Sequence, residues 1–180
     1  RVHKQPLSWR PRAPAPICPF RPWLIDRGSL TMRIQKRCDA FSVRPMLQRY
    51  ARACRDEAGL VGVRPHELAL LREVYLYCGT TPVVFAHSVV PRRGLRGPWR
   101  ALTRLGAKSL GAALFANPVV QRMPLQFKKL NPHHELHRRA CRLLGAKPAH
   151  LWARRSVFRL HGSPILVTEV FLPDILELRP

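Results

Sequence analysis

The sequence predicts an α+β fold, in a single domain with an antiparallel β-sheet. Two segments have the pattern of β-hairpins. Runs rich in β-branched and aromatic residues flank a Gly-Thr-Thr-Pro turn in residues 72–91 and a Gly-Ser-Pro turn in residues 154–173. Helical patterns lie between the two segments. Hairpins separated by a helical block are typical of an α+β fold and not of a doubly wound parallel sheet.

Helices are expected before the first hairpin and between the two hairpins. Residues 23–34 predict a short helix, a turn and a second short segment. Residues 45–58 are predicted to be helical, because Pro45 suits a first helical turn and apolar residues follow it at helical spacing. The remaining helical patterns cover residues 98–105, 108–115 and 132–144.

Composition separates a proline-rich start from a basic domain. The chain has 180 residues and a formal net charge of +22, a length typical of one domain. Residues 1–22 contain six prolines and no acidic residue, which predicts a disordered tail before a domain at 23–180. The charge favours anionic partners. Specific nucleic-acid binding is only weakly indicated, because no aromatic residues alternate with the basic ones in an RNA-recognition pattern.

Five cysteines stand at positions 18, 38, 54, 78 and 141, with no Cys-x-x-Cys pair. The odd count and the length of the chain predict reduced thiols in a cytoplasmic protein. No apolar run reaches the roughly 20 residues of a membrane helix, so no membrane span is expected. No secretory signal is expected either.

Glu169 is the first candidate functional residue. Strand alternation places it on the same face as Ile165, Val167 and Phe171, which is predicted to be the core face. A carboxylate there needs a partner, and it could hold a ligand or exchange a proton. The alternative is a glutamate of an edge strand that points into solvent.

Arg72 is the second candidate. It begins a predicted strand and shares a face with Val74 and Leu76, so its guanidinium would stand over an apolar floor. That setting suits bidentate binding of a carboxylate. The alternative is a partner for a nearby acid or a solvated strand end.

No metal or cofactor site is predicted. His133, His137 and Cys141 share a helical face in the run beginning His-His-Glu-Leu-His, but eight residues of helix span about 12 Å, too far for one ion. A solvated polar face is the interpretation we prefer. The sequence also contains no phosphate-binding glycine motif and no Gly-x-Ser-x-Gly.

Four segments together resemble the chorismate–pyruvate lyase family: LREVYLYC, AHSVVP, LGAKSLGAALF and LWARRSVFRLHGSPILVTEVFLP. The resemblance extends from about Trp23 to Asp174. It implies one α+β domain in which helical flaps close over a buried ligand. It also implies a monomeric lyase that converts chorismate to 4-hydroxybenzoate and pyruvate for ubiquinone synthesis, without cofactor or metal.

The resemblance implies roles for five residues. Arg72 would hold the ring carboxylate of the substrate and Glu169 its ring hydroxyl, as the two catalytic residues. Leu114 and Leu30 would contact the ligand through their main chains, and Leu30 replaces a methionine of the family. His87 stands where arginine is expected. We predict that His87 meets the second carboxylate, the alternative being a buried neutral histidine bonded to the main chain.

Two rival functions remain open at this stage. The same fold resembles effector-binding domains of bacterial transcription regulators, so the chain could sense small carboxylates without catalysis. Its charge leaves a basic nucleic-acid-binding protein as a further alternative. Within the lyase hypothesis, Glu169 could relay a proton or only orient the substrate.

Overall fold

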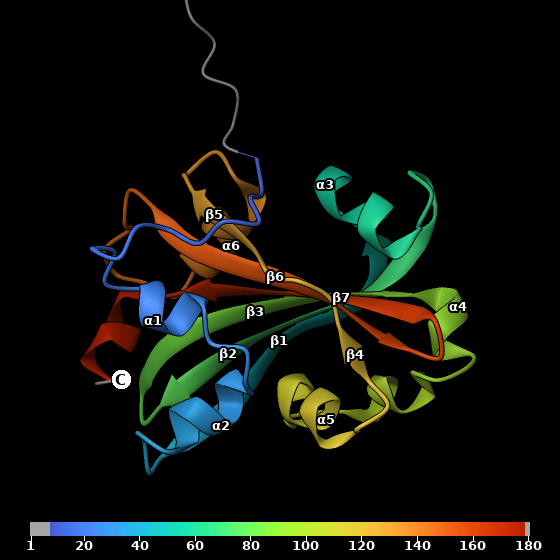
Figure 1. The fold of residues 1–180 in the computed structure, drawn as a ribbon, viewed down its shortest axis with the longest axis horizontal. Helices are drawn as coiled ribbons and strands as arrows, with labels where there is room; N and C mark the ends of the chain where they lie inside the picture. Colours follow the sequence, from blue (N-terminus) through green and yellow to red (C-terminus); the bar gives the residue numbers. More distant parts are fainter. Residues whose placement is uncertain (1–7, 179–180) are drawn as a thin grey trace, which may run out of the picture.

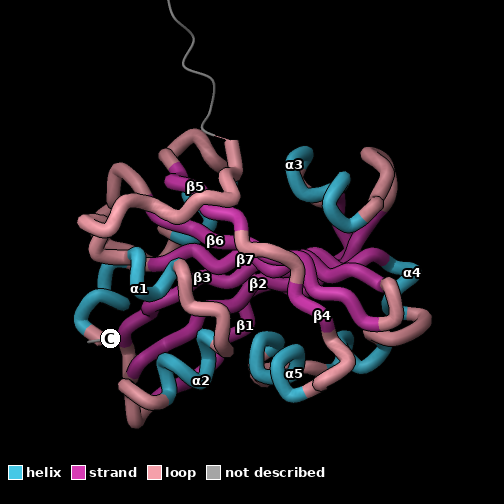
Figure 2. The backbone as a smooth tube through the Cα atoms, viewed as in Figure 1, coloured by secondary structure: helices cyan, strands magenta, loops and turns pink. Residues whose placement is uncertain are grey.

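The computed structural model describes residues 8–178, and within them the strands form one seven-stranded antiparallel sheet (Figures 1 and 2). The strand order is β1-β2-β3-β7-β6-β4, and β5 also pairs with β6. The predicted α+β class is confirmed. The strands are β1 (Phe41–Arg52), β2 (Leu68–Cys78), β3 (Thr81–Pro91), β4 (Gln121–Arg122), β5 (Gln126–Leu130), β6 (Leu151–Leu160) and β7 (Ser163–Phe171).

The helices are short and lie on both faces of the sheet. Figure 1 shows α2 and α5 on one side of the sheet and α3 and α6 on the other. The α-helices are α1 (Arg21–Leu24), α2 (Leu30–Gln35), α3 (Arg55–Ala58), α4 (Arg92–Leu95), α5 (Leu110–Ala116) and α6 (Glu135–Ala140). Three 3₁₀ helices are η1 (Gly59–Val61), η2 (Arg100–Arg104) and η3 (Pro173–Glu177). No helix of the described chain has the length and apolar character to cross a membrane.

Both predicted hairpins are present, and they adjoin each other because β3 pairs with β7. The β6–β7 turn consists of His161 and Gly162, with φ values of 48° and 79°. Positive φ at both turn residues matches the twist of the flanking strands. The two hairpins therefore form the centre of the sheet.

The predicted helix over residues 45–58 is wrong, because residues 41–52 form strand β1. Only the four-residue helix α3 lies in that range. β1 is an edge strand, and its register shifts between Pro45 and Leu47. A proline is tolerated at such an irregularity because no ladder hydrogen bond needs its missing N–H. Pairing with β2 thus overrides a helical spacing of apolar residues.

The other helical predictions are partly confirmed. The segment 23–34 contains the second half of α1 and most of α2, and 108–115 contains most of α5. Within 98–105, only Arg100–Arg104 are helical, as the 3₁₀ helix η2, and the helix expected over 132–144 covers only Glu135–Ala140. The short strands β4 and β5 were not predicted.

Part of the predicted N-terminal tail is in contact with the sheet. The backbone of Arg10 exchanges two hydrogen bonds with Phe127, of 2.9 and 2.8 Å. The indole of Trp9 donates to Asp56 Oδ2 at 2.7 Å. Residues 1–7 lie outside the described residues, and a domain boundary after residue 22 stays a prediction.

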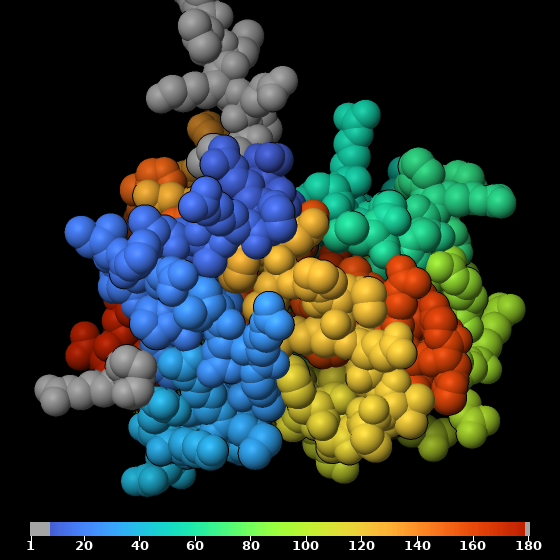
Figure 3. Space-filling model, viewed as in Figure 1, coloured from blue at the N-terminus to red at the C-terminus, as the bar shows by residue number. Residues whose placement is uncertain are grey.

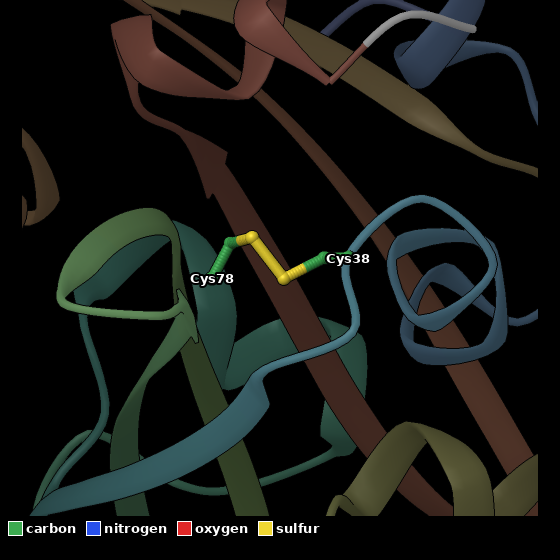
Figure 4. The surroundings of a disulfide bond; sticks show 2 residues. All are labelled: Cys38 and Cys78. Atoms are coloured by element: carbon green, nitrogen blue, oxygen red, sulfur yellow. A yellow bond between two sulfur atoms is a disulfide. The ribbon is translucent and has the colours of Figure 1, made fainter.

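The expectation that all cysteines are reduced is wrong for one pair. Cys38 and Cys78 form a disulfide with a Cα–Cα distance of 5.8 Å (Figure 4). Cys78 ends β2 opposite Phe41, so the β1–β2 pairing brings the segment just before β1 beside it. The bond closes a sequence separation of 40 residues, for which no local motif exists. Cys18, Cys54 and Cys141 are free.

Candidate active site

A cavity lies between the sheet and the two helices α2 and α5. On the sheet side its lining comes mainly from alternate positions of three neighbouring strands, because side chains two residues apart share a face. Its lining comprises Arg72, Val74 and Leu76 from β2, Ala86, His87 and Ser88 from β3, Val167 and Glu169 from β7, Thr31 from α2, and Ser109, Leu110 and Gly111 at the start of α5. Arg72 and Glu169, the two residues predicted to be catalytic, therefore line one cavity.

Arg72 and Glu169 stand at opposite ends of this cavity. Arg72 pairs with Ser88 across β2–β3, and Ser88 pairs with Val167 across β3–β7. Glu169 is two residues further along β7. The path from Arg72 to Glu169 therefore crosses two spacings between strands and two residues along β7. Combined at right angles, these steps put the Cα atoms of Arg72 and Glu169 about 12 Å apart. Both side chains border the space between these two positions.

Arg72 is a buried cation without an acidic partner among the described residues. Its Nη2 donates to the carbonyls of Gly106 at 2.8 Å and Lys108 at 2.9 Å. Its Nε is buried and has no hydrogen-bond partner there. Burial lowers the pKa of the guanidinium. The local acid considered as an alternative is not found among these contacts, and the site has capacity for an anion.

Glu169 forms an ion pair with a residue that the sequence analysis missed. Nε of Arg154 donates to Glu169 Oε2 at 2.5 Å. Nη1 of Arg154 donates to three carbonyls before α2, those of Trp23, Leu24 and Asp26. Arg154 is 1% exposed, so it holds the carboxylate rigidly. Counting back from the His161–Gly162 turn places Arg154 directly opposite Glu169, so the hairpin register carried this signal.

The cavity is closed on the helix side by a contact between α2 and α5. The hydroxyls of Thr31 and Ser109 are 2.6 Å apart and share a hydrogen bond. In the space-filling view the blue α2 region meets the yellow α5 region (Figure 3). The cavity volume is about 40 Å³, enough for a few water molecules and too small for a substituted ring. Outside the contact lies an open groove of about 600 Å³ that includes Thr31 and Ser109. Entry of a ligand thus requires α2 and α5 to separate.

His87 does not take the position that was predicted for it. Its imidazole lies between two carboxylates, with Nδ1 3.0 Å from Glu73 Oε1 and Nε2 3.3 Å from Glu57. His87 pairs with Glu73 across β2–β3, and this face of the strands is opposite to that of Arg72. Joint binding of one ligand by His87 and Arg72 is therefore not supported by the register. The alternative of a neutral histidine bonded to the main chain is not what these contacts show either.

The surroundings of His87 form a buried charged cluster behind the cavity. Burial lowers the pKa of His87, but the hydrogen bonds and charges of Glu57 and Glu73 outweigh this and raise it to about 9. Arg139 donates to Glu73 Oε1 at 2.5 Å and also pairs with Glu135. The contacts of the buried His87 with Glu73 and Glu57 link β3 to β2 and to α3.

The two leucines assigned to main-chain contacts occupy different settings. Leu30 begins α2, and its side chain is buried with Trp23 and Leu24, while its neighbour Thr31 lines the cavity. Leu114 packs in an apolar cluster, and the cavity is lined instead by Leu110, one helical turn earlier. Leu110 is therefore in the lining of this cavity and Leu114 is not, and a main-chain contact of Leu114 with a ligand stays a prediction.

The described residues contain no group of three or more His, Cys, Asp and Glu side chains arranged to hold a metal ion. Nε2 of His137 is 2.9 Å from the carbonyl oxygen of Pro148. The Sγ of Cys141 lies 3.7 Å from Nδ1 of the same imidazole. These two side chains therefore have local partners within and beside α6.

Comparison with known proteins gives a consistent family and a wider fold group. A family model described as chorismate lyase matches residues 12–178. A protein of Nitrosospira multiformis named probable chorismate pyruvate-lyase is 62% identical over 95% of this chain and 96% of its own length. A protein of the same name from Nitrosomonas europaea is 56% identical over 96% and 97% of the two chains.

Several solved structures with the same fold belong to transcription regulators. The effector domain of PhnF from Mycobacterium smegmatis has a TM-score of 0.58 at 18% identity, covering 83% of this chain and 91% of that domain. A GntR-family transcriptional regulator from Bacillus cereus has a TM-score of 0.54 at 12% identity, covering 75% and 93% of the two chains. At these identities the likeness concerns the fold alone.

Proposed function

This chain belongs to the chorismate lyase family, and from that premise we propose that it converts chorismate to 4-hydroxybenzoate and pyruvate. One observation carries the proposal: a buried cation, Arg72, and a carboxylate, Glu169, line the same cavity from positions whose Cα atoms are about 12 Å apart. Chorismate has a ring carboxylate at C1 and a hydroxyl at C4, on opposite sides of its ring. Arg72 binds the carboxylate and Glu169 accepts a hydrogen bond from the hydroxyl.

Main-chain groups of the two flaps complete the binding of the ring carboxylate. Leu30 in α2 and Leu110 in α5 stand next to the Thr31–Ser109 contact that closes the cavity. Their backbone groups are assigned to the carboxylate, with Leu110 taking the role first expected of Leu114. Closure of the flaps excludes water, which strengthens the electrostatic contacts inside. The basic chain favours capture of a dianion.

The reaction is an elimination that makes the ring aromatic. The C4 hydrogen leaves, the C3–O bond breaks, and the enolpyruvyl group gains a hydrogen and departs as pyruvate. Aromatisation supplies the driving force, so the protein has to hold a reactive conformer and stabilise charge on the departing group. Glu169, fixed by Arg154, orients the hydroxyl beside C4. The C4 hydrogen passes either to Glu169 or directly to the enolpyruvyl methylene, and substitution of Glu169 separates the two routes.

The direct test uses purified protein and chorismate with a chelator present. We expect equimolar 4-hydroxybenzoate, measured by chromatography, and pyruvate, measured by a coupled assay. Arg72→Gln should abolish most turnover, because it removes the charge that binds the ring carboxylate. Absence of both products, with binding of 4-hydroxybenzoate retained, would favour a carboxylate sensor of the kind that the regulator folds suggest.

Three further properties are inferred from the family resemblance. They are a role of 4-hydroxybenzoate in ubiquinone synthesis, a cytoplasmic location and a monomeric state. The first is tested in a strain that needs 4-hydroxybenzoate for ubiquinone. The chain should replace the added compound there, and Arg72→Gln should not.

A further inference from the structure

The second carboxylate of chorismate has no receptor in the site described so far. The enolpyruvyl ether is attached to C3, next to the C4 hydroxyl. If Arg72 holds the C1 carboxylate and Glu169 the C4 hydroxyl, the enolpyruvyl carboxylate lies at the Glu169 end of the cavity. A carboxylate moved out of water needs a cation there. The imidazole of His87, the residue first expected to supply it, lies between the carboxylates of Glu57 and Glu73.

Besides the exposed Arg27, three arginines interact with Glu169 or with its partner Arg154, and two of them already have acidic partners. Arg154 is paired with Glu169 and with three carbonyls. Arg33 is paired with Asp26 at 2.8 Å. The third is Arg122 of β4, for which no ion pair is found among the described residues. Arg122 pairs with Phe158 of β6, and Phe158 shares a face with Arg154 because the two are four residues apart in one strand.

The contacts of Arg122 hold its guanidinium in place and leave part of it unused. Nη1 donates to the carbonyl of Arg27, in the loop between α1 and α2, at 2.8 Å. The guanidinium lies over the rings of Phe115 and Phe158, at 5.3 and 5.2 Å. Its Nε is buried without a hydrogen-bond partner among the described residues. A cation fixed in this way, with a free donor, is preorganised for an anion.

Arg122 and Arg154 bind adjacent carbonyls of the α1–α2 loop, because Arg122 donates to Arg27 and Arg154 donates to Asp26. Burial and the charge of Arg154 together lower the pKa of Arg122 to about 10, while the carboxylate of Glu169 acts in the opposite direction. Arg122 also lines a hollow of about 410 Å³ together with Ile25, Arg27 and Leu125. The guanidinium therefore has both a charge environment shared with Glu169 and open space beside it.

We propose that Arg122 binds the enolpyruvyl carboxylate of chorismate and is a catalytic residue for its release. This inference rests on the proposed lyase function. As the C3–O bond breaks, negative charge moves onto the enolpyruvyl oxygen, and a fixed guanidinium beside the group stabilises it. Arg122 also connects the α1–α2 loop to α5 through Arg27 and Phe115, so binding of this carboxylate favours closed flaps.

The test compares chorismate with 4-hydroxybenzoate, which lacks the enolpyruvyl carboxylate. Arg122→Gln should lower kcat/KM for chorismate by about 30-fold or more, the effect of removing one partner of a desolvated charge pair. The inhibition constant of 4-hydroxybenzoate should stay within about twofold of the wild-type value, because that ligand does not reach Arg122. Arg122→Lys should restore part of kcat/KM. Arg72→Gln should weaken both ligands.

Arg159→Gln is the matched control, because Arg159 is an exposed arginine of β6 opposite Gln121, beside Arg122 in β4. Arg159→Gln should change neither kcat/KM for chorismate nor the inhibition constant of 4-hydroxybenzoate. Equal loss of chorismate and 4-hydroxybenzoate binding in Arg122→Gln would mean that Arg122 only supports the flaps, and it would overturn the proposal. Unchanged kcat/KM would overturn it as well. If the wild-type protein makes no product, the lyase function fails separately, and calorimetric binding of both ligands to wild type and Arg122→Gln still decides the role of Arg122.

Discussion

The buried cluster of His87, Glu57 and Glu73 makes stability depend on pH in a defined range. His87 is fully buried, and its pKa is about 9 in the folded protein, against an ordinary value of 6.5. A group whose pKa is raised by folding stabilises the native state fully below its unfolded pKa, and this contribution is lost as pH rises through the folded pKa. The range for His87 is therefore pH 6.5 to about 9.

The size of the effect follows from the two pKa values. Each pH unit between them is equivalent to 1.36 kcal/mol, so the difference from 6.5 to about 9 corresponds to about 3 kcal/mol of unfolding free energy. Glu57 and Glu73 affect the stability of the protein at low pH. Burial raises their pKa values, but contacts with His87 lower them overall. Their contribution is present above the ordinary carboxyl pKa and is lost as pH falls through the lowered values.

The assay is urea unfolding of wild type and His87→Gln at pH 6.5, 7.5, 8.5 and 9.5. Wild type should lose about 3 kcal/mol between the first and the last pH, and His87→Gln should lose much less, because its side chain does not titrate. His87→Gln is also expected to be less stable at pH 6.5, since two buried carboxylates lose their cation. Parallel curves for the two proteins would refute the assignment of a charged His87 in this cluster.

Three shorter predictions concern the site and the disulfide. Glu169→Gln should lower kcat by about 10²-fold or more if Glu169 moves the C4 proton, and by less than about tenfold if it only holds the hydroxyl; wild-type turnover in the folded variant would contradict both roles. Replacement of Cys38 and Cys78 by alanine should lower the unfolding free energy by about 4 kcal/mol for a loop of 40 residues, and equal denaturation midpoints would contradict this. Thr31→Val removes the hydroxyl contact with Ser109, so 4-hydroxybenzoate should dissociate faster in a stopped-flow measurement. The control Thr103→Val changes an exposed hydroxyl in η2 and should leave the dissociation rate unchanged.

The local sequence pattern alone was enough to predict the two hairpins at the centre of the sheet. In the hairpin of β6 and β7, alternation and turn chemistry placed Glu169 on the core face, and a two-residue turn without irregularity keeps the register. The same reasoning placed Arg72 over Val74 and Leu76 on the cavity face of β2. These features depend on residues close in sequence, and local periodicity reports them directly.

The position of His87 shows where such counting fails. Counting back through the Gly79–Thr80 turn would place His87 opposite Arg72. A register shift between Leu76 and Tyr77 moves every later pair by one residue, so His87 lies opposite Glu73. A shift of one residue moves a side chain to the other face of the sheet. This irregularity has no sequence signal comparable to a turn motif.

What the sequence determined by itself was therefore the fold class, the two hairpins, and Arg72 and Glu169 as candidate site residues. What only the tertiary structure decided was that β1 is a strand, that Cys38 meets Cys78, and that Arg122 of β4 lies opposite Phe158 and contacts Arg27. Each of the latter depends on pairing between segments far apart in the chain. The free energy of such pairing comes from burial and hydrogen bonding with a distant partner, and a local pattern does not contain the identity of that partner.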